Sequence, residues 1–326
     1  MMASYSHQYG VACPSFLDQK YASAGRTDKV ILSGAGRREY DGYQSLFDAL
    51  GDLWFQKDFD PKERGYMYRT KYIKNEEGFQ LSVFTGRSDP YYPPFQLVIY
   101  PRDTVTIASY KGYLSRLNQR LPHLNVSSVE YANDIYCLSP KTASELFLTL
   151  RTHMGVSYQG KVETSSGAMK IGRNIRMSST FHIGEDMKTY ERGSDGKKEQ
   201  GGGWLREHID RVRVEYTARR DKLRGADIRT LGDLVRHVNF YAVHLVHGKP
   251  LYGFRCFKGS KKLPKVWQGY RAKDGSKMPG SFQAECIRRR KHMQLSQYVK
   301  PVEYLQPLEE RLVETWHDYD REWKLI

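Results

Sequence analysis

Hydrophobic and polar positions alternate in some segments with the period of a strand and recur in others with the spacing of a helix. Alternating or short apolar runs predict strands at residues 65–74, 79–86, 95–101, 126–138, 174–184 and 210–223. Spacings of three and four predict helices at residues 43–56, 109–124, 139–154 and 229–246. Ser139 and Pro140 suit the cap and first position of the third helix. The strands lack the strict β-α-β rhythm of a parallel sheet, so we expect an α+β fold with a central antiparallel sheet and flanking helices.

The composition changes beyond about residue 240. Residues 257–283 are dense in lysine, glycine and aromatic residues, residues 287–294 fit a helix, and residues 303–323 form a helical end. We therefore predict three parts, which are an N-terminal extension over residues 1–28, a main domain over residues 29–236 and a small basic, partly helical region over residues 237–326.

The net charge of +15 is unevenly distributed. Residues 1–150 hold 17 Lys and Arg against 16 Asp and Glu, whereas residues 151–326 hold 35 against 21. Such an imbalance favours a polyanionic partner, and nucleic acid ranks before an acidic membrane. A soluble protein that is simply basic is the alternative.

Cysteine usage and the chain's start bear on the compartment. The four cysteines lie far apart without a Cys-x-x-Cys pair, which argues against a zinc site and a disulfide framework. No 18-residue apolar run could span a bilayer, and the first residues lack the basic start and apolar stretch of a secretory signal. We expect a cytoplasmic protein with reduced thiols and no membrane partner.

Three acidic residues stand on predicted strands where apolar or neutral residues are usual. Glu130 and Asp134 are four apart, so in a strand both point to one face, and Glu215 stands on another strand beside Arg213. Facing carboxylates repel unless a cation lies between them, and Mg²⁺ or Mn²⁺ is the usual solution. For each acid alone, a solvated face or a pair with a local arginine is the simpler interpretation. The set indicates a metal only if its members converge.

The chain carries three motifs in a fixed order, SVEYANDI at 128–135, TFHIG at 180–184 followed by KTYERG at 188–193, and RVRVEYTARR at 211–220. This order resembles that of the rolling-circle replication initiators of plasmids and phages. The nearest branches are the plasmid "trans" initiators and their conjugative relaxase relatives. The resemblance covers roughly residues 29–236 and implies an HUH-endonuclease-like fold.

The resemblance also implies a set of site residues. The family's metal-binding acids fall on Glu130, Asp134 and Glu215, its tyrosine on Tyr190 and its lysine on Arg192. The pattern departs from the family where Glu130 replaces an aspartate, where His182 replaces an aromatic residue, and in the short spacing from Gly184 to Tyr190.

In such enzymes the tyrosine hydroxyl attacks a phosphodiester, which gives a 5′-phosphotyrosine link and a 3′-hydroxyl primer, and the strand is later rejoined. The resemblance therefore implies a nicking and joining domain that uses Mg²⁺ or Mn²⁺. The implied partners are the origin, its nicked single strand, a host helicase and a second copy of the chain. The same chemistry starts conjugative transfer in relaxases, and a non-catalytic nucleic-acid-binding protein is the other alternative.

Tyr190 has physical features that suit a nucleophile. A phenol with a pKa near 10 attacks poorly at neutral pH, so it needs an oriented phosphate and nearby positive charge. Lys188 and Arg192 stand two residues away on either side, so in an extended segment they share the face of Tyr190. Tyr216 and Tyr131 directly follow Glu215 and Glu130, so they point to the opposite face from those acids. A strand-edge aromatic that covers the sheet is the alternative for Tyr190.

The C-terminal region suits origin binding, because positive charges there alternate with aromatic residues such as Trp267 and Tyr270. The candidate DNA-binding residues are Lys261, Lys262, Lys265, Arg271, Arg288, Arg289, Arg290 and Lys291. A solvated charged helix and loop is the alternative for any one of them.

The basic run at 288–290 gives a first testable prediction. Neutralising Arg288, Arg289 and Arg290 together removes charges that would contact phosphates, so DNA binding should weaken and its dependence on salt should flatten. Binding titrations at several salt concentrations measure both quantities. An unchanged salt slope would refute the assignment.

Overall fold

The structure is a computed structural model, and it describes a defined part of the chain. The described residues are 23–34, 42–51, 54–58, 67–76, 78–102, 105–137, 140–156, 162–171, 174–183, 187–191, 211–236, 240–246, 249–250, 252–257, 299–301 and 303–326. The predictions that fall outside them include the cap at Ser139, the helix over residues 287–294, the role of Arg192, and the basic residues from Lys261 to Lys291.

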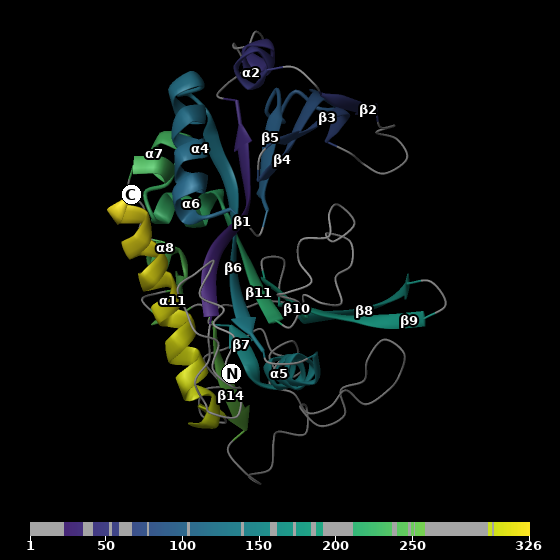
Figure 1. Cartoon of the computed structure of the whole chain (residues 1–326), viewed down its shortest axis with the longest axis vertical. Helices are drawn as coiled ribbons and strands as arrows, with labels where there is room; N and C mark the ends of the chain where they lie inside the picture. The colour runs from purple at the N-terminus through teal and green to yellow at the C-terminus, as the bar shows by residue number, and fades with distance from the viewer. Residues whose placement is uncertain are drawn as a thin grey trace, which may run out of the picture. The chain divides into compact units, whose positions relative to one another are not determined.

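Ten strands form one sheet in the order β2-β3-β4-β5-β1-β6-β11-β10-β9-β8 (Figure 1). They are β1 (Ser23–Ser33), β2 (Phe55–Asp58), β3 (Tyr68–Glu76), β4 (Phe79–Arg87), β5 (Gln96–Pro101), β6 (Asn125–Tyr136), β8 (Val162–Ile171), β9 (Asn174–Ile183), β10 (Met187–Glu191) and β11 (Arg211–Arg219). Each neighbouring pair with a defined register is antiparallel. The predicted α+β fold with a central antiparallel sheet is therefore confirmed.

Helices and two smaller sheets complete the described part. The helices are α2 (Gly42–Leu50), α4 (Ile107–Arg120), α5 (Pro140–His153), α6 (Arg220–Gly225), α7 (Leu231–Arg236), α8 (Phe240–Val243), η4 (Glu303–Leu305) and α11 (Gln306–Leu325). The smaller sheets pair β12 (Leu245–Val246) with β13 (Lys249–Pro250), and β14 (Tyr252–Phe257) with both β7 (Met154–Val156) and β15 (Val299–Pro301). None of the described helices has the length and apolarity that a membrane crossing requires.

Contacts divide the chain into two compact units. Unit 1 comprises Met1–Gly25, Ala132–Tyr216 and His244–Trp316, and unit 2 comprises Arg26–Tyr131, Thr217–Val243 and His317–Ile326. Strands β1, β6 and β11 and helix α11 each contribute residues to both units. The domain limits expected at residues 28 and 236 stay predictions.

In unit 2, aromatic side chains of α8 and α11 pack against one face of β1 and β6. The hydroxyl oxygens of Thr27 on β1 and Tyr319 on α11 lie 2.9 Å apart and share a hydrogen bond. The ring of Tyr131 on β6 meets Phe240 of α8 edge to face at 5.6 Å between centroids. Helices α4, α6 and α7 gather on the same side in Figure 1. Residues of β6 that alternate with Tyr131, such as Glu130, therefore point to the other face.

In unit 1, one face of β11 and β10 is covered. The ring of Tyr216 lies 5.7 Å from that of His244, which stacks on Trp316 of α11 at 3.9 Å between centroids. On β10, the hydroxyl of Thr189 points to the sulfur of Met154 at 3.9 Å. Residues that alternate with these, such as Tyr190, face away from the covering side chains.

Most predicted elements are confirmed, and three differ. The helix predicted over residues 43–56 ends at Leu50, because Gly51 adopts a φ of +72° and donates its N–H to the Phe47 carbonyl, as glycine does after a helix. Residues 55–58 instead pair with β3. The strand predicted over residues 210–223 stops at Arg219, where α6 begins. The helix predicted over residues 229–246 contains α7 and α8 but ends in the strand β12.

Asp320 of α11 holds the start of α8, which gives a stability prediction. Its carboxylate accepts hydrogen bonds from the backbone N–H groups of Phe240 and Tyr241, the second at 3.2 Å. Asp320→Ala leaves the buried N–H of Phe240 and the partly buried N–H of Tyr241 without this acceptor, so the free energy of unfolding should fall by about 1–3 kcal/mol. Urea denaturation measures the loss.

Asp318 on the same helix is the matched control. Its side chain is 48% exposed and pairs with Arg321 at the surface, so Asp318→Ala should change stability by less than about 1 kcal/mol. Equal losses for the two variants would show that the contact with α8 contributes nothing.

Candidate functional site

The pairing of β10 with β11 brings the candidate tyrosine to an acid. The antiparallel register sets Lys188 opposite Glu215 and Tyr190 opposite Arg213. Residues two apart on a strand share a face, so these four side chains lie together on the face away from Tyr216 and His244. Their proximity follows from the alternation of two short strands.

Tyr190 and Glu215 are in direct contact. The phenol hydroxyl of Tyr190 donates a hydrogen bond to Oε1 of Glu215, and the two residues are only 2% and 4% exposed. The ammonium of Lys188 lies 4.1 Å from the centre of the Tyr190 ring and 3.6 Å from Oε2 of Glu215. A carboxylate that already accepts the phenol's hydrogen bond is placed to take its proton.

Asp134 is held differently. Its two carboxylate oxygens accept hydrogen bonds from Nε and Nη2 of Arg213 at 2.6 and 2.7 Å, and Nη1 of Arg211 lies 3.4 Å from Oδ2. Asp134 and Arg213 are fully buried. This fork-to-fork pair neutralises the Asp134 carboxylate with arginine, which leaves its oxygens engaged.

Arg213 connects the two acids of unit 1. Besides its paired contacts with Asp134, its Nη1 lies 4.0 Å from Oε1 of Glu215. A guanidinium keeps its charge at any ordinary pH, so it supplies a fixed positive charge beside both carboxylates.

Unit 2 contributes two further acids on neighbouring strands of the sheet. Glu130 of β6 precedes Tyr131, and since Tyr131 packs against Phe240 of α8, Glu130 points to the opposite face of β6. Asp28 lies on β1, next to Lys29. The ammonium of Lys29 donates a hydrogen bond to Glu130. Burial lowers the pKa of Lys29, but the attraction and hydrogen bond of Glu130 outweigh this and leave that pKa above its usual value.

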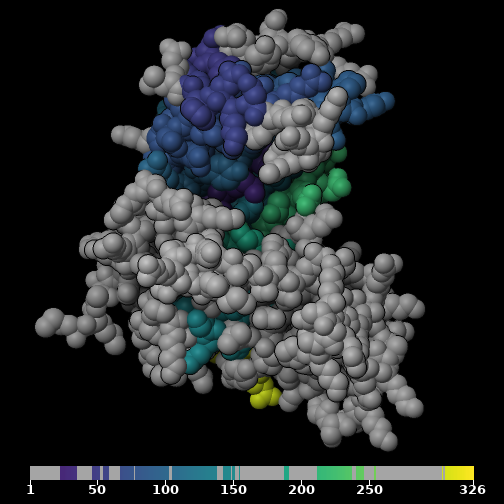
Figure 2. All heavy atoms as spheres, turned by 90° about the vertical axis from the view of Figure 1, so that its right-hand side faces the viewer, coloured from purple at the N-terminus to yellow at the C-terminus, as the bar shows by residue number. Residues whose placement is uncertain are grey.

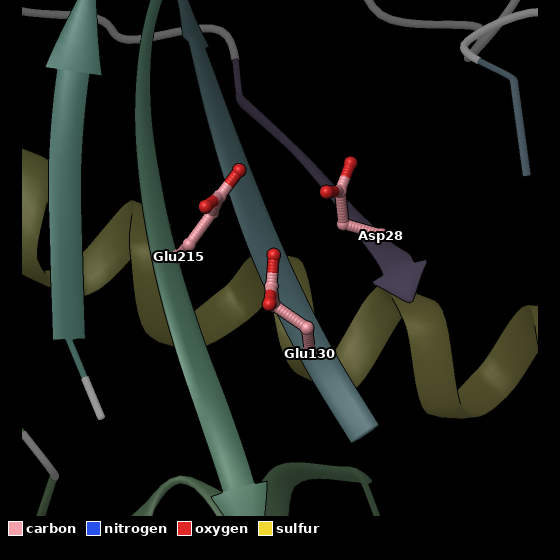
Figure 3. Close-up of side chains that lie close together, drawn as sticks. All are labelled: Asp28, Glu130 and Glu215. Carbon is pink, nitrogen blue, oxygen red and sulfur yellow. The ribbon is translucent and has the colours of Figure 1, made fainter. Parts of the chain in front are cut away.

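Figure 3 shows Asp28, Glu130 and Glu215 on the three strands β1, β6 and β11, with their carboxylates directed toward one another. One carboxylate oxygen from each lies within 4.8 Å of the others, and Asp28 and Glu215 are buried. Three carboxylates this close repel one another unless positive charge lies near them, and Lys29, Lys188 and Arg213 supply part of that charge. Hard divalent cations prefer such oxygen ligands, so this acidic triad could bind a metal ion.

The structure brings some predicted site residues together and separates others. Tyr190, Lys188 and Glu215 converge, and Glu130 joins Glu215 in the triad. Asp134, expected as a third metal ligand, instead pairs with Arg213 and Arg211, and Asp28 is in the triad. The roles of all these residues stay predictions.

Sequence reasoning missed Asp28 and Lys29, and it did not identify Arg213 as the partner of Asp134. The strand β1 was not predicted, so Asp28 and Lys29 were assigned to no element. The alternation of Val212, Arg213, Val214 and Glu215 did contain a signal, because an arginine on the face of a buried acid is expected to pair with an acid nearby.

No protein-family model and no curated protein matches this chain. Among solved structures, the chain is similar to the rolling circle replication initiator protein from Geobacillus stearothermophilus. The two are 13% identical, the similarity covers 74% of this chain and 90% of that chain, and the TM-score is 0.41. At this distance the similarity assigns no residue, so the roles below are argued from the side chains of this chain.

The different environments of Asp134 and Asp28 give a prediction about the metal ligands. Asp134→Asn leaves Arg213 buried without its partner charge, so the free energy of unfolding should fall by about 3–5 kcal/mol. Asp28→Asn removes a carboxylate from the triad, so the affinity for Mn²⁺ should fall about tenfold or more. Urea denaturation and Mn²⁺ titration by calorimetry measure the two effects.

Each variant serves as the control for the other. Asp134→Asn should keep its Mn²⁺ affinity under conditions where it is folded. If it loses as much affinity as Asp28→Asn does, Asp134 belongs among the ligands after all.

Proposed function

We propose that this protein initiates rolling-circle replication by nicking one strand of DNA at an origin with Tyr190 and rejoining it later. The observation that carries the proposal is the hydrogen bond from the Tyr190 hydroxyl to Glu215, a member of the acidic triad. A buried phenol bound to a carboxylate beside a candidate metal site has the parts that a metal-assisted tyrosine nuclease needs.

The proposed step conserves atoms and charge. Glu215 takes the proton of the Tyr190 hydroxyl while the phenol oxygen forms a bond to the phosphorus of the scissile phosphodiester. The bond from phosphorus to the 3′-oxygen breaks, and that oxygen leaves and takes up a proton. The products are a 5′-phosphotyrosine and a free 3′-hydroxyl. Rejoining is the reverse, since the phosphotyrosine bond keeps the phosphodiester's energy.

Asp28, Glu130 and Glu215 would hold the Mg²⁺ or Mn²⁺ ion, which when bound supplies positive charge to the scissile phosphate. The other side chains have separate tasks. Lys188 lies over the Tyr190 ring, where its charge stabilises the developing phenolate and attracts a phosphate. Arg213 adds positive charge beside Glu215, and its ion pair with Asp134 joins β11 to β6.

A hydrolytic nuclease on the same carboxylates is the second candidate. Tyr190 is 2% exposed and bound to Glu215, which also suits a residue that orients a carboxylate while water attacks the phosphate. A conjugative relaxase would use the tyrosine chemistry on a transfer origin. A non-catalytic DNA-binding protein would do neither. A host helicase and a second copy of the chain stay predicted partners.

Incubating the protein with Mn²⁺ and supercoiled plasmid carrying its origin separates these candidates. The wild type should give nicked DNA with protein covalently attached, and EDTA should abolish the product. Tyr190→Phe should lose attachment completely because it lacks the attacking oxygen. A gel that resolves protein-bound DNA before and after protease measures this.

Tyr216→Phe is the matched control, because Tyr216 packs against His244 on the opposite face and should keep attachment. Nicked DNA without attached protein from the wild type would establish the hydrolytic candidate. Equal attachment by Tyr190→Phe would remove Tyr190 as the nucleophile. Origin binding without nicking would leave the non-catalytic interpretation.

A further inference from the structure

The connection between β4 and β5 in unit 2 is a braced loop. Nη1 of Arg87 donates hydrogen bonds to the carbonyls of Pro90 and Tyr92 at 3.0 and 2.9 Å. The N–H of Tyr91 donates to the Asp89 carboxylate at 2.8 Å. Prolines at 90, 93 and 94 fix φ along the same stretch. The loop therefore holds one conformation before any ligand binds.

Two more contacts tie the loop to β3 and its preceding residue. The N–H and hydroxyl of Ser88 both donate to the Met67 carbonyl, at 2.9 and 3.1 Å, and the Tyr68 hydroxyl donates to the Pro93 carbonyl at 3.0 Å. The hydroxyl of Tyr68 is buried, and this burial raises its pKa above the usual value, so it stays a neutral donor.

This rigid loop holds an aromatic side chain in solvent. Tyr91 is 84% exposed, the most exposed large hydrophobic residue of the described part. Ordering a loop to present an aromatic ring costs stability without burying apolar area within the chain. A ring so presented is typical of a surface on which a flat ligand stacks.

Tyr91 lines a pocket of about 260 Å³ whose charged lining residues, among those described, are arginines. Its described lining includes Arg87, Tyr91, Arg220, the amide of Asn125, and the hydroxyls of Ser33 and Ser127, which share a hydrogen bond of 2.9 Å. The described lining residues include two arginines and no carboxylate. In Figure 2, blue and green parts of the chain both reach the visible face.

We propose that this pocket binds one unpaired nucleotide of a DNA strand, with its base stacked on Tyr91 and its phosphate paired with Arg220. Two arginines without a carboxylate suit an anion, and the exposed ring suits a base plane. The pocket volume is enough for a single base and far too small for a double helix. Asn125 is placed to read the edge of that base.

The strands that carry the acids also lead to this pocket. Ser33 stands five residues after Asp28 on β1, and Ser127 stands three residues before Glu130 on β6. At about 3.3 Å per residue these separations are roughly 10–17 Å along unit 2, a span that a few nucleotides cover. The choice of DNA as the strand rests on the proposed function. The pocket would hold a base a few nucleotides from the cut.

Binding of a fluorescent 12-nucleotide oligo(dT) tests the pocket. Tyr91→Ala should bind about 5- to 150-fold more weakly, the range that loss of one stacked base produces, and Tyr91→Phe should bind as the wild type does. Arg220→Gln should reduce the slope of log affinity against log salt by about 0.7, the value for one phosphate contact with a single strand.

Phe55→Ala is the matched control, because Phe55 is 68% exposed on β2 and outside the pocket. It should leave oligo(dT) binding unchanged. Unchanged binding by Tyr91→Ala overturns the proposal. Equal weakening by Phe55→Ala does the same, and so does a Tyr91-dependent loss of equal size with a blunt duplex.

The nicking assay distinguishes a failure of this inference from a failure of the proposed function. If wild-type protein fails to nick but Tyr91→Ala still weakens oligo(dT) binding, the proposed function fails and the pocket stands. Suppose instead that the protein attaches to DNA through Tyr190 while Tyr91→Ala reaches its half-maximal nicking rate at the same DNA concentration as the wild type. In that case the pocket assignment fails and the proposed function stands.

Discussion

Buried carboxylates need compensating charge, and this requirement organises the described part of the sheet. Asp28, Asp134 and Glu215 are at most 4% exposed, and Glu130 is half-buried beside them on the same face. An isolated buried carboxylate would lose its charge or destabilise the fold by several kcal/mol. The chain meets the requirement in two ways. Asp134 pairs with Arg213 and Arg211. Glu130 pairs with Lys29, and Glu215 lies beside Lys188, Arg213 and the Tyr190 hydroxyl.

The partners of each acid therefore distinguish a structural ion pair from a candidate metal site. Asp134 with Arg213 is a closed pair whose oxygens are engaged, and it fixes β6 against β11 within unit 1. The triad of Asp28, Glu130 and Glu215 gathers three carboxylates that could hold a divalent cation. On the opposite face, α8, α11 and their aromatic neighbours take Tyr131 and Tyr216. The burial of those rings is what orients the acids.

Much of this arrangement could be predicted from the sequence, because strand alternation has a period of two. It predicted that Glu130 and Tyr131 point to opposite faces of one strand, as do Glu215 and Tyr216. It also predicted that Lys188 shares the face of Tyr190. It could not identify the partners of Asp134, since which arginine reaches an acid depends on strand order. Asp28 was missed because β1 was not recognised. The end of the helix at Gly51 depended on a positive φ that a spacing of apolar residues does not indicate.

The central claim is that Tyr190 becomes covalently joined to DNA, and mass spectrometry of the joined peptide tests it most directly. After reaction with origin DNA and Mn²⁺, nuclease and trypsin digestion should leave a nucleotide on the short peptide Thr189–Arg192, which contains no other tyrosine. The account predicts a phosphodiester-linked nucleotide on Tyr190. A nucleotide on any other tyrosine, or nicked DNA with no modified peptide, would contradict it.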